Sequence, residues 1–188
     1  MSGRRQQGFS LLELLVTLFV VVLVTSLVTL NIGSGDRDIL ARAAIEGLAE
    51  SANYALDEAQ FSGVNYGLLI RMEDEAGQWR YRYDWLEETL NGWQQPASGK
   101  EVFASGELPD GIEVQLQLDG IVQEQEALVI TTQNPQPQII FYASGETLPG
   151  ALDIRSSDNG ELLWRIEWDL LGNFKPLPGG EELEEAFR

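Results

Sequence analysis

The chain has 188 residues, which is enough for one apolar anchor and one domain of ordinary size. It contains neither cysteine nor histidine, which excludes disulfide bonds, zinc-finger sites and cysteine–histidine catalysis. The formal net charge is −18, and a surface of that sign repels nucleic acid and anionic lipid headgroups. We therefore expect an exported, acidic domain with no nucleic-acid partner.

An apolar run extends from residue 9 to residue 30 and contains one charged residue, Glu13. Its length suffices to cross the hydrocarbon core of a bilayer. Arg4 and Arg5 precede it, so the positive-inside rule keeps the N-terminus in the cytoplasm and exports the rest. An acidic residue at the centre of a spanning helix costs about 2.5–3.5 kcal/mol. A partner from outside the run is therefore expected to compensate Glu13.

The change from polar to apolar residues falls at Gly8, before the run, whereas a secretory signal is cleaved after its apolar stretch. Residues 4–14 read Arg-Arg-Gln-Gln-Gly-Phe-Ser-Leu-Leu-Glu-Leu. This order resembles the N-terminal motif of the type IV pilin and pseudopilin family. Members begin with a short basic leader that ends in Gly, followed by an aromatic residue, a hydroxyl residue, two aliphatic residues and Glu.

The resemblance implies that a prepilin peptidase removes the leader 1–8 by cleavage after Gly8 and then methylates the amine of Phe9. Residues 9–30 then remain as a transmembrane and assembly helix. In a helical filament the carboxylate of Glu13 would meet the positively charged N-terminal amine of a neighbouring subunit. A charge pair in a medium of low dielectric constant is far less costly than a lone charge.

Helical periodicity continues after the anchor, over residues 31–61. The apolar positions recur at spacings of three and four: Leu40, Ala44, Leu48, Ala52, Ala55 and Ala59. Alanine favours the helix and lets it lie close to a sheet. The pattern predicts one long N-terminal helix, with a membrane-spanning half followed by an amphipathic half.

Strand signals dominate residues 62–178, and the clearest alternation of apolar and polar residues is Ile112–Leu118. Asp158-Asn159-Gly160 has the composition of a hairpin turn. Residues 85–93 are predicted to form a short helix or loop, and the tail 179–188 is acidic. The other predicted strands are Val64–Ile70, Trp79–Trp85, Ala127–Thr132, Gln138–Tyr142, Leu152–Arg155 and Leu162–Trp168. The order predicts an α+β, pilin-like fold in which the long helix packs on an antiparallel β-sheet domain.

Two C-terminal segments, Gln138–Pro149 and Asp169–Gly172, resemble the closing part of the H-type minor pseudopilins of type II secretion. That resemblance implies a structural subunit at or near the pseudopilus tip, which helps to initiate assembly and the export of folded exoproteins across the outer membrane. The alternative is a minor pilin that primes a type IV pilus. The missing cysteine pair counts against it, because many pilins close this region with a disulfide.

The family resemblance also implies where the protein works and with what. The expected location is the inner membrane of a Gram-negative bacterium, crossed once, with the C-terminal domain in the periplasm. The expected partners are other minor pseudopilins, the major pseudopilin, the prepilin peptidase and the inner-membrane assembly platform.

The sequence has acidic residues that could serve a metal site or an enzymatic site. Oxygen ligands for calcium are available at Asp153, Asp158, Asn159, Glu161 and Asp169, but they do not follow the spacing of a calcium-binding loop. Pairs of carboxylates arise by chance in so acidic a chain, and no nucleophile motif accompanies them. We therefore expect no metal, no cofactor and no catalytic residue.

Overall fold

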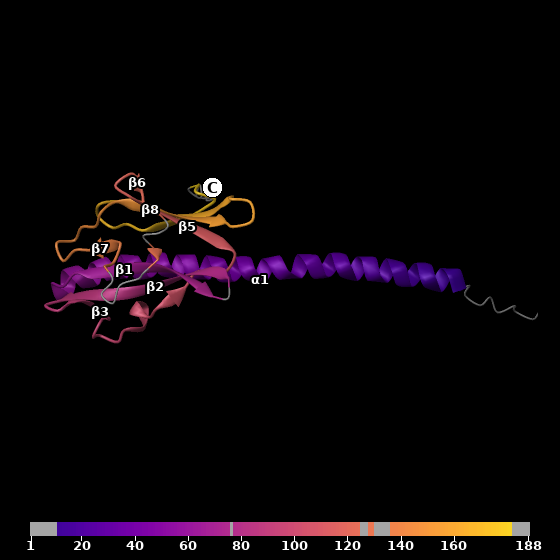
Figure 1. Ribbon diagram of the computed structural model, residues 1–188, viewed down its shortest axis with the longest axis horizontal. Helices are drawn as coiled ribbons and strands as arrows, with labels where there is room; N and C mark the ends of the chain where they lie inside the picture. The colour runs from indigo at the N-terminus through magenta and orange to yellow at the C-terminus, as the bar shows by residue number, and fades with distance from the viewer. Residues whose placement is uncertain (1–10, 76, 125–127, 130–135, 182–188) are drawn as a thin grey trace, which may run out of the picture. The chain divides into compact units, whose positions relative to one another are not determined.

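The structure is a computed structural model that describes residues 11–75, 77–124, 128–129 and 136–181, with the backbone alone at residues 26–38 and 78. Within these residues one α-helix precedes ten β-strands and a short 3-10 helix, η1 (Glu101–Phe103), which is an α+β order (Figure 1). The chain divides into two compact units, Met1–Leu40 and Ala41–Arg188. The division falls inside the helix, and each unit is described by itself.

The helix, α1, runs from Leu11 to Ser62. It ends at Gly63, whose φ of 71° is favourable for glycine and whose N–H donates to the carbonyl of Ala59 at 2.9 Å. Its buried side chains are Ile45, Leu48, Ala49, Ala52, Ala55, Leu56 and Ala59. The predicted apolar stripe is therefore present from residue 45 onward, whereas Leu40 is exposed.

Two antiparallel sheets follow α1. The first has the order β3-β2-β1-β7, with β4 also paired to β2. The second has the order β10-β9-β8-β5-β6. The strands of the first sheet are β1 (Tyr66–Glu75), β2 (Gln78–Thr89), β3 (Gly92–Gln94), β4 (Gly106–Glu107) and β7 (Ile139–Phe141). Those of the second are β5 (Ile112–Leu118), β6 (Ile121–Val122), β8 (Gly150–Ser156), β9 (Leu162–Trp168) and β10 (Lys175–Pro178).

The bounds of β5 and β9 are those that the sequence predicted, whereas β1, β2, β7 and β8 begin and end at other residues than the predicted strands; β1, for example, continues past Ile70 to Glu75. Two further segments differ in kind or lie mostly outside the described residues. The helix or loop predicted at 85–93 was wrong, because β2 continues to Thr89 and then turns into β3. Trp85 and Leu86 are neighbours on opposite faces of β2 and both are buried, so packing on both sides favours the strand over local helical preference. Of the predicted strand Ala127–Thr132, all but residues 128 and 129 lies outside the described residues.

β10 was not predicted, because Pro176 and Pro178 make its sequence untypical of a strand. It pairs with β9 and ends the order of the second sheet. An edge strand tolerates proline because one side of it needs no ladder hydrogen bonds.

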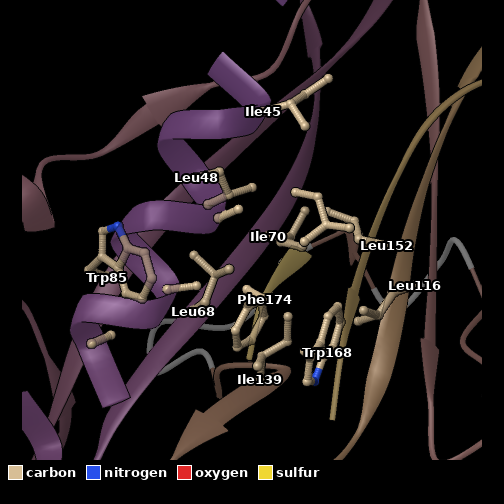
Figure 2. Packing of buried hydrophobic residues seen from close by; sticks show 14 of the residues in the cluster. Ile45, Leu48, Leu68, Ile70, Trp85, Leu116, Ile139, Leu152, Trp168 and Phe174 are labelled. Atoms are coloured by element: carbon tan, nitrogen blue, oxygen red, sulfur yellow. The ribbon is translucent and has the colours of Figure 1, made fainter. Parts of the chain in front are cut away.

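One hydrophobic core joins α1 to both sheets. Figure 2 shows Ile45 and Leu48 of α1 in the same cluster as side chains from the two sheets. The first sheet contributes Leu68, Ile70, Trp85 and Ile139, and the second contributes Leu116, Leu152 and Trp168. Phe174 lies between the two sets, with its ring centroid 4.8 Å from that of Trp168 and 5.5 Å from that of Phe141.

The segment between β9 and β10 lies along α1 and fastens the second sheet to it. Asn53 of α1 hydrogen-bonds both backbone groups of Phe174: its Nδ2 donates to the carbonyl at 3.1 Å, and its Oδ1 accepts from the N–H at 2.9 Å. Asp169 accepts from the N–H of Asn173 at 3.0 Å, which closes the turn. Gly172 has a φ of 69°, and a Cβ at this position would lie 2.5 Å from Cδ2 of Leu56. Gly172 thus allows both the turn and the close approach to the helix.

This close approach predicts that Gly172→Ala destabilises the fold more than an equivalent change elsewhere. Gly160→Ala is the matched control, because Gly160 has a φ of 71° with no atom within 4 Å of a Cβ. We expect the control to cost about 1–2 kcal/mol for the left-handed backbone alone. Gly172→Ala should cost about 1–3 kcal/mol more, since Leu56 must move. Urea unfolding of the full chain in detergent, followed by tryptophan fluorescence, measures both; equal losses would contradict the packing role of Gly172.

Candidate assembly site

The N-terminal part of α1 carries one of the predicted site residues, Glu13. Gly8 and Phe9 lie outside the described residues, so the cleavage and methylation site stays a prediction. Glu13 lies in the first turn of α1. Thr17 Oγ1 donates to the carbonyl oxygens of Glu13 and Leu14, each at 2.9 Å, and Thr25 Oγ1 bonds the carbonyl of Val21 in the same way at 2.8 Å. These hydroxyl groups are satisfied by their own helix, which suits an apolar environment.

Every large apolar side chain from Leu11 to Val24 is exposed, by fractions between 48% and 81%. They lie on all sides of the helix: Leu11, Leu12, Leu14, Leu15, Val16, Leu18, Phe19, Val20, Val21, Val22, Leu23 and Val24. A helix that is apolar all round requires a lipid or protein environment on every side. This surface is the candidate assembly surface.

The predicted membrane span, 9–30, is only partly described. Residues 9 and 10 lie outside the described residues, as do the side chains of residues 26–30. In the part of the chain that the structure describes, no helix has the combined length and hydropathy of a membrane-spanning segment.

A charged cluster joins Lys100, in the loop before η1, to Tyr54 and Glu58 of α1. Lys100 Nζ donates to Glu58 Oε2 at 2.7 Å and to Tyr54 Oη at 2.8 Å, and Tyr54 Oη donates to Glu58 Oε2 at 3.1 Å. Three residues later Phe103 is buried and stacks on Tyr66 at 4.9 Å. Sequence reasoning missed this cluster, because a single lysine in a polar loop carries no pattern that names its partner.

The hydrogen bond from Lys100 is the largest cause that lowers the pKa of Glu58 below its ordinary value of 4.5. A carboxyl group whose pKa is lower in the folded protein stabilises the fold above the unfolded value, and that stabilisation is lost as the pH falls through the folded value. Glu58→Gln should therefore lower the free energy of unfolding at neutral pH and have a diminishing effect as the pH falls below 4.5. Denaturant unfolding over this pH range measures the difference.

The matched control for this prediction is Asp57→Asn, which alters an exposed carboxylate on the same helix. It should change the free energy of unfolding little, because exposed charges contribute little to stability. A constant gap between the wild-type protein and Glu58→Gln at every pH would show that Lys100 does not stabilise the charged carboxylate.

The second sheet contains one buried carboxylate, Asp153, among the described residues. Arg165 binds it through Nε at 2.6 Å and Nη2 at 3.0 Å, and Arg155 Nη2 lies 3.0 Å from the same carboxylate. Burial raises the pKa of Asp153, but the hydrogen bonds and charges of Arg165 and then Arg155 outweigh burial and lower the pKa. Asp153 is therefore ionised and held by two guanidinium groups.

The structure does not bring the five possible calcium ligands together. Asp153 is bound to its two arginines. Asn159 and Glu161 bond each other within the turn, where Glu161 N–H donates to Asn159 Oδ1 at 3.0 Å, and Asp169 bonds Asn173. Within the described ranges, no group of three or more acidic, histidine or cysteine side chains could hold a metal ion.

Comparison with known families gives two matches along the chain. The family described as "Type II transport protein GspH" matches residues 44–172, which includes the amphipathic part of α1 and both sheets. The "Prokaryotic N-terminal methylation motif" matches residues 3–29, which contain Gly8, Phe9 and Glu13. The two matches therefore cover the two regions on which the resemblance was based.

Individual proteins agree with these matches. The type II secretion system protein H of Aeromonas hydrophila is 27% identical over 194 residues, which cover 98% of this chain and 100% of that protein. Two structures of the minor pseudopilin EpsH from the type 2 secretion system of Vibrio cholerae share the fold, with TM-scores of 0.57 and 0.54. Their identities are 23% and 24%, and the alignments cover 76% and 78% of this chain and 98% and 97% of theirs. The pilin-like fold predicted from the sequence is confirmed.

Proposed function

The chain belongs to the family of type II transport protein GspH, the minor pseudopilins of type II secretion, and we propose that it is a structural subunit at or near the tip of a pseudopilus. There it helps to initiate assembly and the export of folded exoproteins across the outer membrane. The match of the GspH family to residues 44–172 carries this proposal. That match favours type II secretion over the alternative of a type IV minor pilin.

In this proposal α1 is the element of assembly. The prepilin peptidase cleaves after Gly8 and methylates Phe9, and the apolar part of the helix holds the subunit in the inner membrane until it enters the filament. The exposed apolar side chains from Leu11 to Val24 then pack against the helices of other minor pseudopilins and the major pseudopilin. The inner-membrane assembly platform drives this transfer, and the acidic β domain stays in the periplasm.

Glu13 sets the axial position of the subunit by meeting the N-terminal amine of a neighbour. We expect Glu13→Gln to leave membrane insertion intact and to impair incorporation into the pseudopilus. Breaking a buried charge pair costs about 3–5 kcal/mol, which is enough to abolish one subunit contact. Glu13→Asp keeps the charge and should restore part of the function. Membrane fractionation and exoprotein release measure the two effects, and normal release by Glu13→Gln would contradict the pairing.

Cleavage after Gly8 gives a direct prediction for the mass of the mature protein. Replacement of Gly8 by a bulky residue such as valine should block the peptidase, so that the protein keeps residues 1–8 and gains no methyl group. Gly3→Val, a change within the leader away from the cleavage site, should be processed normally. Intact-mass spectrometry distinguishes the two forms. A normal mature mass for Gly8→Val would show that the leader has been wrongly assigned.

A further inference from the structure

The outer face of the second sheet, which points away from α1, carries two arginines that are each about one-third exposed. They are Arg155 of β8 and Arg165 of β9, with exposed side-chain fractions of 35% and 33%. Arg165 donates hydrogen bonds to Asp153 through Nε and Nη2, and within the described residues its Nη1 makes no hydrogen bond. An edge of this guanidinium is therefore available to a second carboxylate.

Aliphatic side chains surround the two arginines on the same face. Residues directly opposite one another in neighbouring strands share a face of the sheet. Leu177, which is buried, is opposite Arg165. Leu162 is opposite Arg155 at a register shift between β8 and β9, and Leu163 is 39% exposed. We call this face, made of Arg155, Arg165, Leu162, Leu163 and Leu177, the arginine–leucine face. It offers both charge and apolar area to one occupant.

The face also carries two competing carboxylates, which limit what it can bind. Glu167 of β9 is exposed and lies on the same side of its strand as Arg165, two residues away. Glu113 of β5 is exposed and lies opposite Arg155, but their charged groups do not pair within 4.0 Å in the described structure. A ligand bound by charge alone would be attracted by the arginines and repelled by the carboxylates of the face, or the reverse. An occupant with apolar side chains as well as carboxylates fits the arginine–leucine face better than a simple anion.

The chain itself arrives at this face just before residue 182. Beyond β10, Gly179 N–H donates to the carbonyl of Leu163 at 2.8 Å. Gly179 and Gly180 have φ values of 60° and 79°, which turn the chain. A Cβ on Gly180 would lie 2.8 Å from Cδ2 of Leu162, so the backbone leaves the domain against the side chain that shares its face with Arg155.

The residues that follow have the complementary chemistry. Residues 181–188 read Glu-Glu-Leu-Glu-Glu-Ala-Phe-Arg, with four carboxylates and with Leu183 and Phe187 spaced four apart. Neighbouring strands lie about 4.8 Å apart, and an extended chain gains about 3.3 Å per residue. Seven residues beyond Glu181 therefore reach across β9 and β8 with length to spare.

We propose that residues 182–188 dock on the arginine–leucine face of their own subunit. Their glutamates bind the available guanidinium edge of Arg165 and are attracted by the charge of Arg155, whose Nη1 and Nη2 already donate to the carbonyl of Gly160 at 3.3 Å and to Asp153 at 3.0 Å. Leu183 or Phe187 covers Leu163. The docked segment would occupy a face of the domain that a neighbouring acidic segment could otherwise use. This inference does not depend on the proposed function.

Because the chain has no native cysteine, a disulfide test of this docking is simple. Ala186→Cys is combined with Glu113→Cys on the arginine–leucine side, or with Asp57→Cys on the exposed side of α1 as the control. Both pairs are made in the full chain in detergent and oxidised under identical conditions. We expect the Glu113 pair to form an intramolecular disulfide at least about tenfold faster, since docking raises the effective concentration of the two thiols.

The charge contribution is tested in the same background. Arg155→Gln should slow formation of the disulfide, and Arg155→Lys should slow it less because the charge is kept. Salt at about 1 M should slow it as much as Arg155→Gln does, because it screens exposed charges within about 3 Å. Equal rates for the Glu113 and Asp57 pairs would overturn the proposal. A disulfide that forms between two chains instead of within one would also overturn it, by assigning the face to another subunit.

Discussion

The packing of the alanine-rich side of α1 against two sheets is the constraint on which the rest of the structure depends. Ala49, Ala52, Ala55 and Ala59 are buried in the core cluster that α1 shares with both sheets, where their small side chains leave room for larger residues of the sheets. Larger residues at these positions would separate the helix from the core around Phe141 and Phe174. The sheets need this contact because each leaves an apolar face that only the helix and the other sheet cover.

Each edge of the helix is then fastened by a polar contact of a different kind. On one edge Asn53 replaces a missing backbone partner for Phe174, and on the other Glu58 and Tyr54 hold Lys100. Hydrogen bonds of this type are directional, whereas burial of apolar area is not. The alanines therefore form part of the core that α1 shares with the sheets, and the polar contacts determine how the helix is rotated about its own axis.

Patterns repeated within one element could be predicted from the sequence, and contacts between distant segments could not. The alternation in β5 and β9 and the stripe on α1 follow from the regular geometry of strand and helix. β10 has two prolines in four residues, and residues 85–89 are strand because Trp85 and Leu86 pack on both faces. The bonds of Asn53 to Phe174 join residues 121 positions apart, and no local pattern carries that information. Gly8, Phe9 and Glu13 could be predicted as assembly residues for the opposite reason, since their motif is local and contiguous, and their roles stay predictions.

In the proposed function the apolar helix mediates assembly and the acidic domain stays outside the helix core of the filament. The whole chain has a formal net charge of −18, which favours repulsion between neighbouring domains, while the helix supplies the attraction between subunits. The assignment to type II secretion is tested most directly by a clean deletion in the source bacterium, complemented with the full chain. Exoprotein release and twitching motility are both assayed. We predict exoproteins trapped in the periplasm with motility intact. Lost motility with normal release would contradict the assignment to type II secretion and would identify a type IV minor pilin.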